Sequence, residues 1–179
     1  MGKIHGWSDK QKGLIDLVFR QEIPKPKEFV KVFAHGGRGA GKSRAMLYII
    51  DEICNNTIGM NFLVTRRSFE SIRLDTFNIL KFDPGILDAS KGKWIDKGKT
   101  FLYHKTGSRM HFEHMERSDS LLGPTYGGIY VEQIELCNED DFRLLNATLR
   151  QFSVNHEYWE KYKTQIENHE IRLKEYSRP

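Results

Sequence analysis

Apolar positions recur along this chain with the spacings of helices and of buried strands. Helical spacing, together with capping residues, predicts helices that open at Ser8 and Asn138 and helices that span 42–55 and 68–81. Short apolar runs predict buried strands over 29–34, 61–65 and 129–132. The segments 100–104 and 109–113 alternate apolar and polar residues around a polar turn and predict a β-hairpin. Strands that alternate with helices favour an α/β fold, with a mostly parallel central sheet flanked by helices.

The composition narrows the class of protein. Of the 179 residues, 39% are hydrophobic and 29% are charged, so a core can form beneath a well-solvated surface. We expect one domain over 1–155 and a charged, helical tail over 156–179. No apolar run approaches the roughly 20 residues of a membrane helix, and the polar N-terminus carries no signal segment, so we expect neither a membrane partner nor secretion. Cys54 and Cys137 match no metal-ligand spacing and are expected to be reduced thiols.

A glycine-rich segment supplies the first candidate chemistry. The residues GGRGAGKS contain the pattern G-x-x-x-x-G-K-S/T between an apolar strand and a helix. Glycines let the backbone turn so that its N–H groups point at phosphates, and the following helix adds its positive N-terminal end. Lys42 is expected to reach the β- and γ-phosphates, and Ser43 to offer its hydroxyl to Mg²⁺. The motif therefore predicts binding of ATP with Mg²⁺ through Gly36, Gly37, Arg38, Gly39, Ala40, Gly41, Lys42 and Ser43.

A hydrolase of this type also needs a carboxylate on Mg²⁺ and a group that orients the attacking water. Glu132 ends the apolar strand 129–132 and is the expected Mg²⁺ ligand, with a plain surface glutamate as the alternative. The next position, where many such ATPases carry a catalytic glutamate, is Gln133. An amide can orient water but is not a general base, so either turnover is impaired or another group, such as Glu135, substitutes.

The ordered combination of segments resembles the ATPase domain of phage large terminases, the motor that packages DNA into capsids. The resemblance covers residues 8–150 and rests on GGRGAGKS at 36–43, FLVTRRSFESIRLDTFNIL at 62–80 and TGSRMHFEHMERSDSLLGPTYGGIYVEQ at 106–133. It implies a P-loop NTPase fold of the ASCE type with a β-hairpin insertion, and ATP hydrolysis coupled to movement of double-stranded DNA. It further implies a portal and a small terminase subunit as partners, a homo-oligomeric ring, and the cytoplasm of an infected host cell.

The resemblance also assigns roles to single residues. Gln11 becomes the adenine-recognising glutamine, with the capping box at Ser8 as the alternative reading. Arg38 becomes the loop arginine that senses or stabilises the γ-phosphate, with a solvated loop charge as the alternative. Arg66 and Arg67 follow a strand near the expected nucleotide face, where ion-paired surface arginines are the alternative. The expected catalytic set is Arg38, Lys42, Glu132 and Gln133.

The sequence departs from the family in ways that keep other hypotheses open. Gln133 replaces the usual glutamate, the coupling motif after it is unclear, and no acidic cluster suggests the nuclease site that follows in the family, so this chain is not expected to cut DNA. A second hypothesis is therefore a nucleotide-gated binding module with impaired hydrolysis. A third is another P-loop enzyme, such as a DNA-dependent ATPase or a small-molecule kinase.

Charge and histidines add little that is specific. The net charge of +4 permits a polyanionic partner. The lysines around the predicted hairpin form either a solvated face or a surface that tracks phosphates; they are Lys91, Lys93, Lys97, Lys99 and Lys105. His111 and His114 have no third ligand at a plausible spacing, so we do not expect them to bind a metal.

Overall fold

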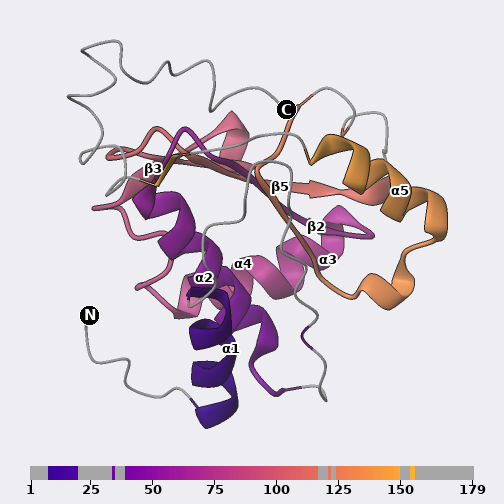
Figure 1. The fold of residues 1–179 in the computed structure, drawn as a ribbon, viewed down its shortest axis with the longest axis horizontal. Coiled ribbons are helices and arrows are strands. Elements are labelled where there is room, and N and C mark those ends of the chain that lie inside the picture. Colours follow the sequence, from indigo (N-terminus) through magenta and orange to yellow (C-terminus); the bar gives the residue numbers. More distant parts are fainter. Residues whose placement is uncertain are drawn as a thin grey trace.

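The structure is a computed structural model that describes residues 8–19, 34, 39–116, 121, 124–149 and 154–155 (Figure 1). Its helices are α1 (Asp9–Phe19), α2 (Lys42–Asn56), α3 (Phe69–Ser71), α4 (Phe77–Phe82) and α5 (Glu139–Thr148). Its strands are β1 (Thr57–Ile58), β2 (Asn61–Arg66), β3 (Gly92–Ile95), β4 (Thr100–Tyr103), β5 (Arg109–His114), β6 (Gly128–Val131) and β7 (Val154–Asn155). Short helical turns complete it: the π-helix η1 (Ile72–Thr76) and the 3₁₀ turns η2 (Asp96–Gly98) and η4 (Ile134–Leu136).

A five-stranded sheet with the order β3-β4-β5-β2-β6 forms the centre of the described part. Strand β2 runs parallel to both β5 and β6, whereas β3, β4 and β5 are joined by antiparallel pairings. The α/β fold class is confirmed, but this sheet is mixed rather than mostly parallel. The predicted hairpin is confirmed as β4 and β5, and β5 joins the centre of the sheet beside β2. The predicted strand 29–34 falls almost entirely outside the described residues, and the tail 156–179 falls wholly outside them.

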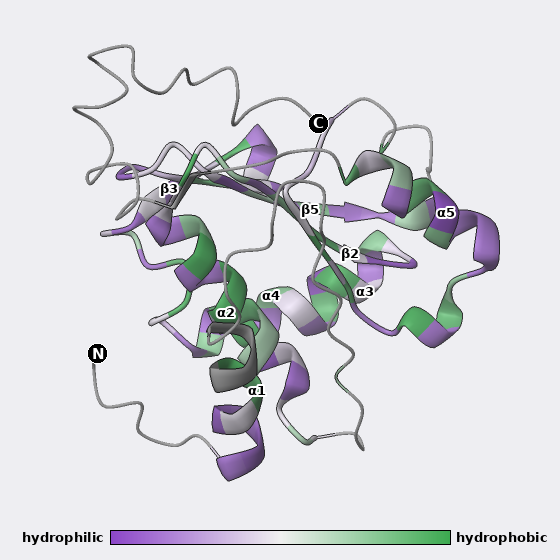
Figure 2. Cartoon of the chain, in the orientation of Figure 1, coloured by the Kyte–Doolittle hydropathy of each residue, from purple (hydrophilic) through white to green (hydrophobic). Residues whose placement is uncertain are grey.

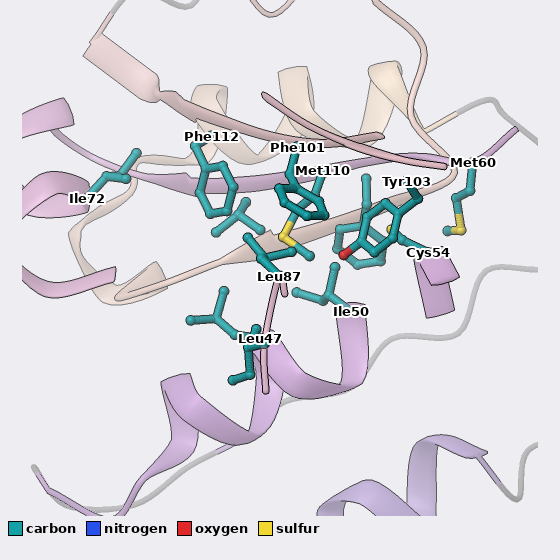
Figure 3. Packing of buried hydrophobic residues seen from close by; sticks show 13 residues of the cluster. Leu47, Ile50, Cys54, Met60, Ile72, Leu87, Phe101, Tyr103, Met110 and Phe112 are labelled. Atoms are coloured by element: carbon teal, nitrogen blue, oxygen red, sulfur yellow. The ribbon is translucent and has the colours of Figure 1, made fainter. Parts of the chain in front are cut away.

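Helices cover both faces of the sheet. Successive residues of a strand point to opposite faces, and Leu63 and Val64 of β2 are both fully buried. Val64 belongs to the larger cluster, which Leu47 and Ile50 of α2 join from one side (Figure 3). Leu63 belongs to a smaller cluster with Leu145 of α5 on the other side. Because burying each large apolar side chain contributes about 1.5–3 kcal/mol, this packing fixes α2 and α5 against the sheet.

The predicted helices alternate in hydropathy along their length, and those that open at Ser8, Ser68 and Asn138 start at polar caps (Figure 2). Asn138 and Asp141 form a reciprocal capping box at the start of α5, which confirms that prediction. The first helix packs its Ile15 against Ala45 and Ile49 of α2. Of the helices that the structure describes, none combines the length and the apolar character needed to cross a bilayer.

The predicted helix over 68–81 is confirmed as one helical segment with a widened turn in its middle. Ser68 caps it by accepting a hydrogen bond from the Ser71 backbone N–H, 3.3 Å away. In η1 the N–H of Phe77 donates to the carbonyl of Ile72, which is the five-residue spacing of a π-turn. The sequence pattern did not predict this turn, and it lies beside the residues of the candidate site.

Candidate nucleotide-binding site

The described part of the glycine-rich segment leads directly into α2. Gly39 and Gly41 have φ angles of 77° and 73°, in the left-handed region that favours glycine. Gly41 is the N-cap of α2 and provides no side-chain cap. The first turn of α2 begins with Lys42 and Ser43, and Gly41 offers its leading N–H groups no side-chain acceptor. Of the predicted loop residues, Gly36, Gly37 and Arg38 lie outside the described residues.

Gln11 lies against this loop. Its Oε1 accepts a hydrogen bond from the Ser8 backbone N–H at 2.9 Å, so the predicted capping box is confirmed. Its Nε2 donates to the Gly41 carbonyl at 3.0 Å. A Cβ added to Gly41 would lie 2.1 Å from that Nε2, so the Gln11 side chain would have to move aside, and the φ of 73° itself favours glycine here. The adenine contact of Gln11 stays a prediction.

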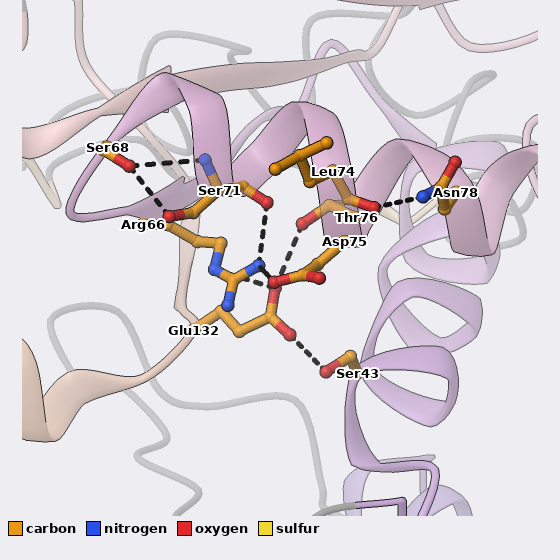
Figure 4. A network of polar contacts seen from close by, with 9 residues as sticks. All are labelled: Ser43, Arg66, Ser68, Ser71, Leu74, Asp75, Thr76, Asn78 and Glu132. Atoms are coloured by element: carbon orange, nitrogen blue, oxygen red, sulfur yellow. Dashed lines mark hydrogen bonds and ion pairs between the residues drawn. The ribbon is translucent and has the colours of Figure 1, made fainter.

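The start of α2 meets the end of β6. The Glu132 backbone N–H donates to the Thr65 carbonyl at 2.9 Å, which continues the pairing of β6 with β2 past Val131. The Glu132 carboxylate thereby leaves the sheet on the side of α2, where its Oε1 accepts a hydrogen bond from the Ser43 hydroxyl (Figure 4). These two residues stand 89 positions apart in the sequence. The structure thus brings together the two side chains that the sequence predicts as Mg²⁺ ligands.

The second oxygen of Glu132 faces the π-turn and β2. Its Oε2 accepts a hydrogen bond from the Thr76 hydroxyl at 3.0 Å, and it lies 3.6 Å from Nε of Arg66. The Arg66 side chain is only 4% exposed and donates through Nη1 to Asp75 Oδ2 at 2.5 Å and to the Ser71 carbonyl at 2.8 Å. Arg66 is therefore ion-paired, as the alternative interpretation proposed, but it is buried rather than on the surface. Arg67 is exposed.

The oxygen donors suit Mg²⁺. A serine hydroxyl and one carboxylate are the protein ligands that Mg²⁺ commonly takes when phosphates and water complete its coordination. Glu132 is 8% exposed, so its charge is held largely out of bulk water and beside Arg66. Within the described ranges, no group of three or more His, Cys, Asp or Glu residues could hold a metal ion. A cation at Ser43 and Glu132 would therefore depend on ligands from a nucleotide and from water.

Tyr130 is a neighbour of the site that the sequence analysis treated only as part of a strand. It stands two residues before Glu132, on the same face of β6. Burial raises the pKa of the Tyr130 phenol, the Glu132 charge raises it further, and a hydrogen bond with Ser43 opposes both effects. The phenol thus remains protonated beside the Ser43 hydroxyl. The two-residue spacing from Glu132 was the signal that would have identified it.

Gln133 begins a turn away from the sheet. Its φ and ψ angles are 58° and 53°, a left-handed conformation, and its side chain is exposed. Glu135 is also exposed, one residue into η4. Within the described residues, the carboxylate of Glu132 is hydrogen-bonded to Ser43 and Thr76, and neither Gln133 nor Glu135 joins that network. The structure thus places Gln133 next to the site in sequence and exposed to solvent.

The lysines around the hairpin divide into two groups. Lys91 is ion-paired with buried Asp51, and Lys99 pairs with Glu113 at 3.2 Å. The exposed ones are Lys93, Lys97 and Lys105. Contact of this exposed group with phosphates stays a prediction.

Comparisons with known proteins find similarity of structure. No protein-family model matches the sequence, and no curated relative matches it. Two structures of the large terminase of a thermophilic bacteriophage match with TM-scores of 0.63 and 0.61, at 16% and 14% sequence identity, over 90% and 96% of this chain. A complex of the same large terminase with ADP matches with a TM-score of 0.50 and 15% identity over 64% of this chain and 29% of that one. The chain spans 43% of the length of the first two structures. It therefore has the fold of the phage large terminase in the part that it spans.

Proposed function

We propose that this chain is an ATP-binding motor domain of the large-terminase type, which couples ATP hydrolysis to packaging of double-stranded viral DNA into the capsid. The observation that carries the proposal is the contact between Ser43 and Glu132, which joins the start of the phosphate-loop helix to the end of a buried strand. The shared fold supports it, because the large terminase in one matching structure holds ADP. The motif predicts this contact, whereas a chance glycine-rich turn gives no reason to expect it.

In this proposal the site residues have separate tasks. Lys42 contacts the β- and γ-phosphates, Arg38 contacts the γ-phosphate, and backbone N–H groups from Gly36 to Ser43 surround the phosphates. Ser43 and Glu132 hold Mg²⁺, which when bound supplies neutralisation of the charge on the phosphate oxygens. Gln133 orients the attacking water, and the proton of that water goes to the released phosphate, because an amide is not a base.

The proposal extends to the assembly in which the domain works. We infer a homo-oligomeric ring that contacts the portal and the small terminase subunit in the cytoplasm of an infected host cell. The exposed side chains of Lys93, Lys97 and Lys105 are candidates for contacts with DNA phosphates. A single subunit with so few such contacts is expected to bind DNA weakly, with an affinity that falls as salt rises.

A second candidate function is a nucleotide-gated binding module that holds ATP and changes its affinity for a partner without useful turnover. Gln133 favours it, because an exposed amide supplies no general base. Phosphate release that DNA stimulates would support the motor, whereas nucleotide-dependent DNA binding without phosphate release would support the module. Transfer of phosphate to a small acceptor would point instead to another P-loop enzyme.

Nucleotide binding is the first property to test. Titration calorimetry with ATP and Mg²⁺ on Lys42→Ala should show about ten- to a hundredfold weaker binding, since losing a charge-assisted contact costs roughly 1.5–3 kcal/mol. Lys81→Ala, which removes an exposed lysine at the end of α4, is the matched control and should bind like the unaltered chain. Equal affinity of Lys42→Ala and the unaltered chain would remove the central claim.

A further inference from the structure

Thr76 occupies a position that the proposed function does not yet use. Its side chain is fully buried in the π-turn, and its hydroxyl donates to Oε2 of Glu132 at 3.0 Å. Oε1 of the same carboxylate is hydrogen-bonded to Ser43. We propose that Thr76 is a positioning residue for the Mg²⁺ site: it holds Oε2, so that Oε1 is the oxygen presented to Ser43 and to the cation. The inference rests on the proposed function, since it assumes that Glu132 binds Mg²⁺.

The physical need for such a residue follows from the freedom of a glutamate side chain. The terminal torsion of glutamate has a broad, roughly two-fold profile, so rotamer preference alone does not orient the carboxylate. A donor on one oxygen fixes that torsion, and Thr76 is such a donor. Arg66 adds its charge from 3.6 Å on the same oxygen, Oε2. Partners of this kind orient metal ligands in many sites and contribute to metal affinity.

The π-turn acts on both neighbours of Glu132, because it supplies Thr76 and holds Arg66 of β2 in place. Asp75 pairs with Arg66, while the adjacent Thr76 contacts Glu132, and both side chains point to the same polar network (Figure 4). The Ser71 carbonyl, at the start of this turn, accepts from Arg66 as well. Widened turns of this kind often occur at functional sites. Here the turn holds Arg66 and Thr76 on the same oxygen of the carboxylate.

A second buried threonine shows that a helical threonine need not contact a side chain from a distant segment. Helical threonines commonly donate to a carbonyl of the preceding turn in their own helix. Thr148 of α5 does so, to the Leu145 carbonyl at 2.8 Å. Thr76 instead donates to a side chain 56 positions away. Thr148 is therefore a matched control, because it is buried and helical and belongs to a local hydrogen bond.

The test measures the Mg²⁺ concentration that half-saturates binding of a fluorescent ATP analogue to the full chain. Thr76→Val keeps the shape and removes the donor, and it should raise that concentration about 10- to 100-fold. Binding of the analogue without Mg²⁺, in EDTA, should not change, because Lys42 and the loop are intact. Thr76→Ser, which keeps the donor, and Thr148→Val should both require the same Mg²⁺ concentration as the unaltered chain.

The outcomes separate this inference from the proposed function. An unchanged Mg²⁺ requirement in Thr76→Val, or an equal shift in Thr148→Val, would overturn the positioning role while leaving the function standing. A chain that binds no nucleotide at any Mg²⁺ concentration would overturn both. If Thr76→Val does not fold, Thr76→Ala and Thr76→Ser form a pair that differs only in the hydroxyl. Equal Mg²⁺ requirements in that pair would again overturn the role.

Discussion

The side-chain amide of Gln11 joins the first helix to the phosphate loop. Its Nε2 donates to the Gly41 carbonyl at 3.0 Å, while its Oε1 accepts from the backbone of Ser8. The same glutamine thus caps α1 and holds the residue at which the loop enters α2. Because the Gln11 amide donates to the residue whose left-handed backbone starts α2, the loop conformation and the docking of α1 depend on each other.

Gln11→Glu separates these two roles. Glutamate can still accept from the Ser8 N–H in a capping box, but its carboxylate has no donor for the Gly41 carbonyl. We expect weaker binding of both ATP and GTP, by about three- to tenfold, since a neutral hydrogen bond contributes about 0.5–1.5 kcal/mol. Titration calorimetry with each nucleotide measures the effect.

Ser8→Ala is the control, because it removes a cap contact and leaves in place the hydrogen bond from the Gln11 side-chain amide to the Gly41 carbonyl. It should lower the stability of α1 by about 0.5–2 kcal/mol with little effect on nucleotide affinity. A loss in Gln11→Glu that is confined to ATP would contradict the loop-mediated effect and would instead establish contact with adenine.

Lys91 neutralises a carboxylate in the core. Asp51 of α2 is fully buried, accepts from the Tyr103 phenol at 2.8 Å and from the Leu87 N–H at 3.2 Å, and is ion-paired with Lys91. Lys91→Met leaves that charge without its cation, and breaking a buried ion pair in this way costs about 3–5 kcal/mol. Urea unfolding should show a loss near the lower end of that range, because the Lys91 side chain is 21% exposed.

Lys93→Met is the matched control for this loss, since Lys93 lies in the same part of the chain and its side chain is exposed. It should change stability by less than about 0.5 kcal/mol. Equal stability of the two variants would show that Asp51 is satisfied by Tyr103 and Leu87 alone.

We predict that His111 makes the folded chain less stable in mild acid. Burial lowers the pKa of this imidazole below 6.5, Arg109 lowers it further, and Asp96 and Glu113 oppose the shift. As pH falls through 6.5, the unfolded chain takes up a proton at His111 that the folded chain takes up only at lower pH, so unfolding becomes more favourable. That contribution is lost between pH 6.5 and the lower folded pKa.

Urea unfolding between pH 7.5 and pH 5 should therefore show that the free energy of unfolding falls less steeply with falling pH in His111→Gln than in the unaltered chain. All other histidines are common to both proteins, so the difference in slope isolates His111. Identical slopes would mean that the imidazole has the same pKa in the folded and unfolded chains.

The sequence pattern predicted the elements better than their arrangement. The helix expected over 42–55 is Lys42–Asn56, and the strand expected over 61–65 is Asn61–Arg66, because both carry strong apolar periodicity. Strand β3 was missed because it lies at the sheet edge, where Lys93 and Trp94 are exposed and apolar alternation is weak. The mixed sheet was missed because pairing of β5 with β2 depends on contacts between distant segments, which local pattern does not encode.

The residues of the candidate site also differ in whether the sequence could predict them. Ser43 and Glu132 follow from a motif and from the end of an apolar strand, and the structure brings them together. The contact of Thr76 with Glu132 and the burial of Arg66 depend on which face of the segment formed by α3, η1 and α4 meets that strand end. No local signal predicts the π-turn that presents Thr76, so these neighbours could be found only from the fold.

Gln133→Glu should raise the ATPase rate and leave ATP affinity nearly unchanged. Lys42, Ser43 and Glu132 supply binding in our proposal, and this substitution alters none of them. What it adds is a carboxylate directly after the Mg²⁺ ligand, and general-base assistance is typically worth about 10²–10⁴-fold in rate. Because Gln133 is exposed and its backbone already lies in the left-handed turn, glutamate fits without a change of fold.

The measurement is phosphate release at high protein concentration with DNA present, since an arginine from a neighbouring subunit can itself be worth about 10³–10⁵ in rate. Glu135→Gln is the companion variant, because Glu135 is the other exposed carboxylate on this turn. If Gln133→Glu is no faster while Glu135→Gln abolishes turnover, Glu135 is the base and Gln133 only its neighbour. If neither substitution changes a rate near zero, although ATP still binds, the chain works as a nucleotide-gated module rather than as a motor.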